Sequence, residues 1–255
     1  GEFIRNGWSM KQLHRTIVTS ATYRQSSNQR PELAERDPRN LWLARQNRVR
    51  LDAEIVRDAA LQASGLLNPR LGGPPVFPPQ PEGVYSFTQS SKAWNVSQGA
   101  DRYRRAVYTM FYRSAQHPLT STFDAPNFSA SCTRRLRSNT PLQALMLAND
   151  EMFFETAQAG ANLLWKSSPG LGPEPDRERI VLAFGRFLAR QPQPKELEKS
   201  LQFIEHARGN QNNAPPVASS STPAHQMEGQ TPRETAVWTA FVRGVMNTDE
   251  FITRE

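Results

Sequence analysis

The sequence FDAPNFSASCTRRLRSNTPLQALMLANDEMFFE, residues 123–155, contains most of the unusual features of this chain in one place. It holds the only cysteine, and three arginines stand just before a predicted helix start at Thr140. Thr140, Pro141 and Gln143 suit such a start: a threonine hydroxyl can accept a free backbone N–H, proline loses nothing at the first helical position, and glutamine can reach back. The stretch therefore predicts a loop that leads into a short buried helix.

The arginines of this loop predict an anion-binding site. They precede the unpaired N–H groups and the positive dipole end of the helix, where phosphate, sulfate or carboxylate is stabilised. The candidate site comprises Asp124, Asn127, Arg134, Arg135, Arg137, Asn139 and Thr140. The alternative is that Asp124 pairs with an arginine merely to hold the loop against a helix, because ion-pair networks are often structural.

Cys132 is a candidate reactive thiol, since nearby arginines can lower the pKa of a thiol, but a lone cysteine is more often a small buried apolar residue. One cysteine forms neither an internal disulfide nor a cysteine-based metal site, and the sequence has no Cys-x-x-Cys-His haem-attachment motif. The four histidines are scattered, and no phosphate-binding or catalytic motif occurs. We therefore expect no metal and no cofactor in this chain.

The composition indicates a globular chain with long connections. Hydrophobic residues make up 37% of the 255 residues, and there are 20 prolines. No run approaches the roughly 20 apolar residues that span a bilayer, and no secretory start occurs. Because the first residue is Gly and not Met, we expect a piece of a longer protein.

The net charge of +7 is unevenly distributed. Residues 1–150 carry 20 Lys and Arg against 11 Asp and Glu, a net of +9, whereas residues 151–255 carry 11 against 13, a net of −2. Most basic residues are arginines, which suit bidentate contacts with carboxylate, phosphate or sulfate, although a genome of biased base composition gives the same excess. The arginines are spread among acids and no nucleic-acid-reading motif appears, so nucleic acid is not an expected partner.

Apolar spacing of about 3.6 residues and the capping signals predict mainly helices. The helix predicted at 48–64 carries four charged residues on the face opposite its apolar residues: Asp52, Glu54, Arg57 and Asp58. They form a solvated, ion-paired face or, less expectedly, a general acid and base. The expected helical segments are 9–23 with Ser9 as cap, one from Asp37 with Leu41, Trp42 and Leu43, 48–64 ended by Gly65, one from Pro141, one capped by Asp150, one from Asp176, one from Pro194 to Gly209, and one from Thr231.

Two further segments are not helical in pattern. Residues 68–81, NPRLGGPPVFPPQP, predict an extended strap, because prolines remove backbone donors, and Val76 and Phe77 should anchor it to the body. Within residues 84–113, the runs VYSF (84–87) and RRAVYTMFYR (104–113) are rich in aromatic and β-branched side chains, which predicts a pair of strands. Trp94, Tyr85, Tyr103 and Tyr108 in this region form either an aromatic platform for sugar rings or part of the core.

Residues 209–230 are rich in Asn, Ser, Pro and Gly and predict a flexible insertion within a single domain, 1–255. The apolar segment that follows it must pack on the body. The fold class expected overall is mainly α, an irregular helical domain of about seven helices with a small two-stranded β element and long Pro-rich loops.

The segment GWSMKQLHRTIVTSATYRQSS (7–27), the stretch 123–155 and the closing VRGVMNTDEFITRE (242–255) carry a family resemblance. They resemble the planctomycete-specific domain of the PSD-one type, a domain of unknown function that forms the C-terminal part of large secreted proteins with cytochrome-c-like modules. The resemblance covers residues 7–255 and is weakest at 209–231. It implies a periplasmic, secreted or cell-surface location, other modules of the parent protein as partners, and any haem in upstream modules.

These features together predict a non-catalytic interaction module of an extracytoplasmic, cytochrome-linked protein, with an anion or acidic-glycan site on the 123–155 stretch. No membrane span is expected. The alternative is an enzyme acting on polysaccharide, with Asp124 as acid or base, Arg134 or Arg137 as oxyanion stabilisers, and Cys132 or His117 assisting. The enzyme requires Asp124 to lie in an open cleft near a second titratable group.

Overall fold

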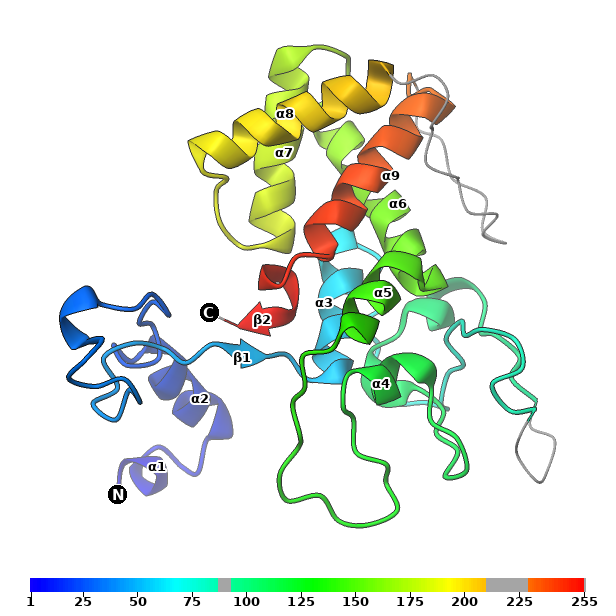
Figure 1. The fold of residues 1–255 in the computed structure, drawn as a ribbon. Coiled ribbons are helices and arrows are strands. Elements are labelled where there is room, and N and C mark those ends of the chain that lie inside the picture. The colour runs from blue at the N-terminus through cyan, green and yellow to red at the C-terminus, as the bar shows by residue number, and fades with distance from the viewer. Residues whose placement is uncertain (87–92, 210–228, 255) are drawn as a thin grey trace. The chain divides into compact units, whose positions relative to one another are not determined.

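The computed structural model describes residues 1–86, 93–209 and 229–254. Within these residues the fold is mainly helical with a small antiparallel sheet, as the sequence predicts (Figure 1). The chain divides into two compact units: the N-terminal unit, residues 1–50 with 253–254, and the core unit, residues 51–252. Each unit is described by itself, and the single domain expected over 1–255 stays a prediction.

The N-terminal unit begins with α1 (Glu2–Arg5) and α2 (Met10–Thr19), followed by the 3-10 helix η1 (Pro31–Leu33). Ser9 caps α2 as expected, its hydroxyl accepting a hydrogen bond from the backbone N–H of Gln12 at 3.3 Å. The helix ends at Thr19 and not at residue 23, because Ser20 takes an extended conformation.

Residues 37–45, which we call the 37–45 loop, form turns, and the helix predicted from Asp37 is wrong. The carboxylate of Asp37 accepts hydrogen bonds from the N–H groups of Leu41 at 2.7 Å and Trp42 at 2.8 Å. Asn40 and Leu43 have φ of 54° and 52°, a left-handed conformation that non-glycine residues rarely adopt. The Asp37 carboxylate therefore accepts hydrogen bonds from N–H groups that would bond to backbone carbonyls in a helix.

The sheet of the described residues consists of β1 (Val49–Arg50) and β2 (Thr253–Arg254), paired antiparallel with Val49 opposite Arg254. A two-stranded element is therefore present, but its predicted position at 84–113 is wrong. There the chain forms the 3-10 helices η2 (Gly99–Tyr103) and η3 (Ala106–Tyr108). The carboxylate of Asp58 accepts from the N–H of Ala106 at 2.7 Å, which turns the backbone out of an extended path.

The helices of the core unit begin where the sequence offers a capping residue or a proline. Proline is the first helical residue of α4, α5, α7, α8 and α9, where its missing N–H costs nothing. The helices are α3 (Ala53–Ser64), α4 (Pro118–Thr122), α5 (Pro141–Asn149), α6 (Glu151–Ser167), α7 (Pro173–Phe187), α8 (Pro194–Gly209), α9 (Pro232–Met246) and the 3-10 helix η4 (Glu250–Ile252). Most of the predicted helix starts are confirmed, whereas α7 begins three residues before Asp176.

Helix α6 is the centre of this unit and packs against α3, α5, α7 and α9. Figure 1 shows α9 running along α6. The core face predicted for α6 is confirmed, since these of its residues are buried: Met152, Phe153, Ala157, Ala161 and Leu164. Asp150 caps it, accepting from the N–H of Met152 at 3.0 Å. Thr231 caps α9 in the same way, its hydroxyl accepting a hydrogen bond from the backbone N–H of Glu234. Gly65 ends α3 with a left-handed φ of 79°.

Two helix faces differ from the prediction. Arg57, expected on the solvated face of α3, is buried. On α5, Leu142 and Leu145 are exposed, whereas Gln143 and Leu147 are buried. Gln143 takes the inner position because its amide donates to the backbone carbonyl of residue 122 at 3.1 Å.

The strap of residues 68–81 follows the body as predicted, with Val76 buried as its anchor. Val76 donates its N–H to the carbonyl of Tyr108 at 2.8 Å. The guanidinium of Arg104 lies over the Tyr108 ring, 3.8 Å from its centroid, and donates to three strap carbonyls, those of Arg70, Gly72 and Pro74. One arginine therefore organises the turn of the strap. The flexible insertion expected at 209–230 falls on residues 210–228, outside the described residues.

The close approach of α6 to its neighbours generates a stability prediction at Gly160. A Cβ there would lie 2.9 Å from Cζ of Phe187 and 3.2 Å from Cγ1 of Val242. Gly160→Ala should therefore lower the free energy of unfolding by about 1–3 kcal/mol through overpacking, as measured by urea denaturation. Gly185→Ala is the control, because a Cβ at that site in α7 meets no described atom within 4 Å. Equal losses in both variants would contradict the packing argument.

Candidate functional site

A hollow of about 570 Å³ lies on the core unit beside Trp94, and we call it the aromatic hollow. Its lining combines aromatic rings with carboxylate, amide and guanidinium groups. The residues that the argument uses are Gln80, Glu82, Tyr85, Trp94, Gln98, Arg102 and Glu151. They come from the end of the strap, from the segment before η2, from η2 and from the first turn of α6, and so the hollow joins the irregular part of the unit to its central helix.

The aromatic wall is fixed by ring contacts and one hydrogen bond. The indole N–H of Trp94 donates to the carbonyl of Pro78 at 2.7 Å. Its ring centroid lies 5.5 Å from that of Tyr85 and 5.1 Å from that of Phe77, the latter edge to face. Burial raises the pKa of Tyr85, whose hydroxyl interacts with the side chain of Gln80. A half-buried indole held in this way presents a rigid apolar surface.

Of the four aromatic residues predicted as a platform, the structure brings Tyr85 and Trp94 together. Tyr108 lies under the Arg104 guanidinium, and Tyr103 packs against the hydrophobic core. These two therefore serve packing, the alternative given for them.

The polar floor of the hollow is an ion-pair network around Arg102. Its guanidinium donates from Nε to Oε2 of Glu155 at 3.0 Å and from NH2 to Oε1 of Glu151 at 2.8 Å. The side chains of Arg102 and Glu155 are buried, whereas Glu151 is partly exposed. Burial alone would lower the pKa of Arg102, but its hydrogen bonds to Glu155 and the nearby carboxylate charges outweigh burial and raise that pKa. The buried charges are thus compensated and held rigidly.

A second pair of ionisable groups lies behind this network. Arg57 donates to the backbone carbonyl of Arg102 at 2.9 Å, and burial lowers the pKa of Arg57 to about 10. Burial raises the pKa of Asp150 to about 6, against the opposing effects of the Met152 N–H and the Arg57 charge. Desolvation thus outweighs a nearby opposite charge for both groups.

His117, named as an assistant in the enzyme alternative, is buried and fully engaged. Its Nε2 lies 2.9 Å from the carbonyl of Pro79, and its Nδ1 accepts from the N–H of Leu119 at 3.3 Å. Burial lowers the pKa of His117 to about 4, which keeps the ring neutral near pH 7. The ring therefore ties the strap to α4.

Two arginines of the 123–155 stretch meet acids at the beginning of α3. Arg135 binds Glu54 through two hydrogen bonds, of 2.6 and 3.1 Å. Arg137 lies 3.6 Å from a carboxylate oxygen of Asp52. These hydrogen bonds to Glu54 raise the pKa of Arg135. The loop is therefore attached to the beginning of α3 by ion pairs between half-exposed side chains, and the acids are Glu54 and Asp52, not the Asp124 of the structural alternative.

Asp124 does not bind the arginines through any hydrogen bond or ion pair in the described part of the chain. Its carboxylate instead accepts from the N–H and the hydroxyl of Ser138, both at 2.7 Å. Asn127 accepts from the N–H of Ser129 at 3.2 Å and likewise shapes the loop locally. The enzyme alternative, with Asp124 as acid or base and Arg134 or Arg137 as oxyanion stabilisers, stays a prediction.

The remaining predicted residues lie open to solvent. Cys132 is exposed, and its thiol lies 3.3 Å from the carbonyl of Arg134. Among the described residues, the Arg134 side chain has no carboxylate partner, and Thr140 starts α5 without capping it. Asn139 is exposed. The anion site and the reactive thiol stay predictions.

Sequence reasoning missed the network at the hollow, although a signal was present. Glu151 and Glu155 are spaced four residues apart at the start of an otherwise apolar helix, so they share one face. A carboxylate on an apolar face requires a buried partner. The partner, Arg102, is 53 residues away from Glu155, and local pattern does not identify it.

The described residues include no group of three or more His, Cys, Asp or Glu side chains placed to hold a metal ion. Nor do they include a helix that is both long and apolar enough to cross a bilayer. The core unit is mainly helical, with an irregular segment held by arginines and an open, aromatic-walled hollow.

The profile of the family PSD1, described as a protein of unknown function (DUF1553), matches residues 1–204. The match covers most of the chain, and the chain belongs to this family. Helix α9 lies beyond the matched residues yet packs against α6 in the same core. No curated protein and no solved structure matches the chain.

Asp150 generates a prediction on the pH dependence of stability. Burial raises its pKa from 3.8 to about 6, so the folded chain holds this proton more tightly than the unfolded chain. The resulting stabilisation is complete below about pH 4 and lost as the pH rises through about 6. Asp150→Asn keeps the helix cap and removes the titration. The free energy of unfolding of the wild type minus that of the variant should fall by about 2–3 kcal/mol between pH 4 and 7.

Urea denaturation at several pH values measures this difference. His117, with its pKa lowered to about 4, has the opposite pH dependence, but it is present in both proteins and cancels. A difference that stays flat across this range would mean that Asp150 is not desolvated.

Proposed function

We propose that the chain is a non-catalytic interaction module that binds a polysaccharide chain in the aromatic hollow. The observation that carries the proposal is the combination of a fixed Trp94 ring with planar polar side chains around one open cavity. A sugar ring has an apolar face and a rim of hydroxyl groups. It therefore complements a site with an aromatic wall and several carboxylate and amide groups.

The dimensions and the polar groups of the hollow support this ligand class. A volume of about 570 Å³ lies within the range of small-molecule sites. Glu82 and Gln98 on the rim are exposed, and the Gln98 amide, which donates to the carbonyl of Val96 at 3.0 Å, can exchange that bond for one to a sugar hydroxyl. Glu151 is oriented by Arg102, which fixes one polar group at the floor. A ligand thus meets rigid groups below and adaptable groups above.

A binding role suits this site better than a catalytic one. The Glu151 carboxylate at the floor already accepts a hydrogen bond from Arg102, so its position is set before a ligand arrives. The competing proposal is a polysaccharide-cleaving enzyme that uses Asp124 with Arg134 or Arg137. It is less well supported, because the Asp124 carboxylate is engaged by Ser138.

The setting of the module is part of the proposal and rests on the family resemblance. We place it in the periplasm or at the cell surface, beside other modules of a longer, cytochrome-linked parent protein. A secretory signal and a haem-attachment motif in the sequence of the full-length protein would support this setting.

The rim residues provide the test of the hollow. Glu82→Ala with Gln98→Ala should weaken binding of the preferred neutral oligosaccharide, among cellohexaose, xylohexaose and chitohexaose, by about tenfold, because two hydrogen bonds to hydroxyl groups are lost. Titration calorimetry measures the affinity. Both side chains are exposed, so the urea midpoint should stay unchanged.

The matched control changes the same residue types on α8, Glu198→Ala with Gln202→Ala, which are also exposed. This control should bind as the wild type does. Failure of the wild type to bind any of the three oligosaccharides, or equal weakening by both double variants, would overturn the sugar proposal.

A second candidate, an acidic-glycan site on the 123–155 stretch, is favoured by one observation. Arg134 is exposed and lacks a carboxylate partner among the described residues, unlike Arg135 and Arg137 beside it. Arg134→Ala should weaken binding of dextran sulfate severalfold at low salt without changing the free energy of unfolding. Arg135→Ala should lower the free energy of unfolding, by up to about 1 kcal/mol, because Glu54 loses its partner. Unchanged dextran sulfate binding by the Arg134 variant would remove this candidate.

A further inference from the structure

The N-terminal unit carries an apolar surface without an apolar interior. Its buried residues, among 1–50 and 253–254, are all polar: Ser27, Asp37 and Asn40. Helix α2 has Met10, Leu13 and Ile17 at helical spacing, yet all of its residues are exposed or half-buried. A helix of ten residues is marginal in water by itself. Its apolar stripe therefore needs a covering surface.

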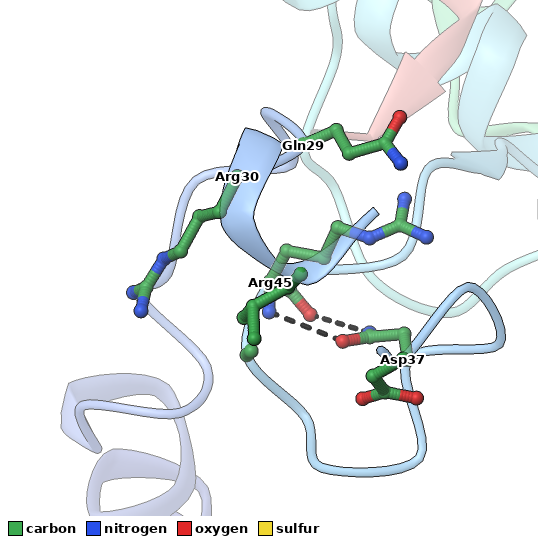
Figure 2. A pocket seen from close by; sticks show the side chains of 7 residues that line it. Gln29, Arg30, Asp37 and Arg45 are labelled. Carbon is green, nitrogen blue, oxygen red and sulfur yellow. Dashed lines mark hydrogen bonds between the residues drawn. The ribbon is translucent and has the colours of Figure 1, made fainter. Parts of the chain in front are cut away.

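The 37–45 loop of the same unit is built as a rigid structure. The amide of Asn40 donates to the carbonyl of Arg45 at 2.7 Å and accepts from its N–H at 3.2 Å, which closes the base of the loop. Figure 2 shows Asp37 and Arg45 at the small hollow beside this base, with Gln29 near them and Arg30 turned away. Side chains within the unit thus hold the loop in one conformation.

This rigid loop presents three consecutive large apolar side chains to solvent. Leu41, Trp42 and Leu43 are 75%, 62% and 56% exposed. The left-handed backbone conformation at Asn40 and Leu43 costs free energy, so surrounding contacts must stabilise it. Strained backbone that keeps a tryptophan and two leucines in water indicates a surface prepared for contact with an apolar phase.

The charge of the unit restricts what covers this surface. Residues 1–50 hold ten Lys and Arg against four Asp and Glu, a net of +6 in a chain of net +7. Lys11 and Arg15 lie one turn apart on α2, on the face away from Leu13 and Ile17, and Arg36 and Arg39 are exposed next to the apolar loop residues. Two copies of such a face would repel each other, whereas an anionic surface attracts it.

We propose that the N-terminal unit is a membrane-surface docking element for bilayers that contain anionic lipid. The stripe of α2 and the side chains of Leu41, Trp42 and Leu43 enter the boundary between headgroups and acyl chains, and the basic residues contact the headgroups. Tryptophan is suited to this depth, because its ring is apolar and its N–H is polar.

Vesicle sedimentation tests this docking with the full chain. Wild type should bind vesicles of equal parts phosphatidylglycerol and phosphatidylcholine at least about tenfold more tightly than vesicles of pure phosphatidylcholine. Replacing Leu41, Trp42 and Leu43 together by Ser should weaken binding to the anionic vesicles by about tenfold or more, since the apolar insertion is lost. Lys11→Glu with Arg15→Glu should weaken it by a similar factor.

Leu142→Ser with Leu145→Ser is the matched control, because these α5 residues of the core unit are 66% and 56% exposed. This control should bind the anionic vesicles as the wild type does, and circular dichroism checks that each variant keeps its helices. Three results would overturn the proposal: equal binding to both vesicle types, wild-type binding by the triple variant, or a dimer in sedimentation velocity that the triple variant abolishes.

Discussion

The buried ion pair between Arg102 and Glu155 is the interaction on which the rest of the core unit depends. Glu155 lies on the central helix α6, and Arg102 belongs to the irregular segment that contains η2 and η3. Both side chains are buried, and removal of either partner would leave a largely uncompensated buried charge, which typically costs about 3–5 kcal/mol. The backbone carbonyl of Arg102 also accepts a hydrogen bond from the buried guanidinium of Arg57 on α3. One residue, Arg102, thus connects α6 through its guanidinium and α3 through its backbone carbonyl to the irregular segment.

The position of the aromatic hollow follows from this junction. Glu151 lies one turn before Glu155 and shares Arg102 with it, so the floor of the hollow is part of the same rigid network. Trp94 is fixed separately, by its bond to the strap. A site whose polar groups belong to a central helix keeps its geometry better than one formed by loops alone. The hollow is thus open to solvent but supported by buried charges.

Much of the helical part of this fold could be predicted from the sequence, because its signals are local. Asp150 and Thr231 indicated helix starts, and the apolar spacing of α6 identified its buried face. The faces of α3 and α5 could not be assigned in this way. Arg57 is buried because distant charges surround it, and Gln143 is buried because its amide meets a carbonyl 21 residues away.

The candidate site was less predictable, and for the same physical reason. Arg135 is 81 residues from Glu54, so no local pattern could indicate that its charge is already compensated. The 37–45 loop failed differently: Asp37 has the pattern of a helix cap, but its carboxylate binds the N–H groups four and five residues ahead and curls the chain into turns. The Asp37 carboxylate thus selects turns over a helix, two local structures that composition does not distinguish.

The hydrogen bonds from Arg104 to the strap determine how this segment opens. Carbonyls of Arg70, Gly72 and Pro74 all accept from this one side chain, whose aliphatic and planar parts are buried against the Tyr108 ring. If the guanidinium swings out, the three bonds break in a single event, and the segment opens as a whole and not residue by residue. A proteolytic cut in this glycine–proline turn would therefore track the rate of one side-chain release.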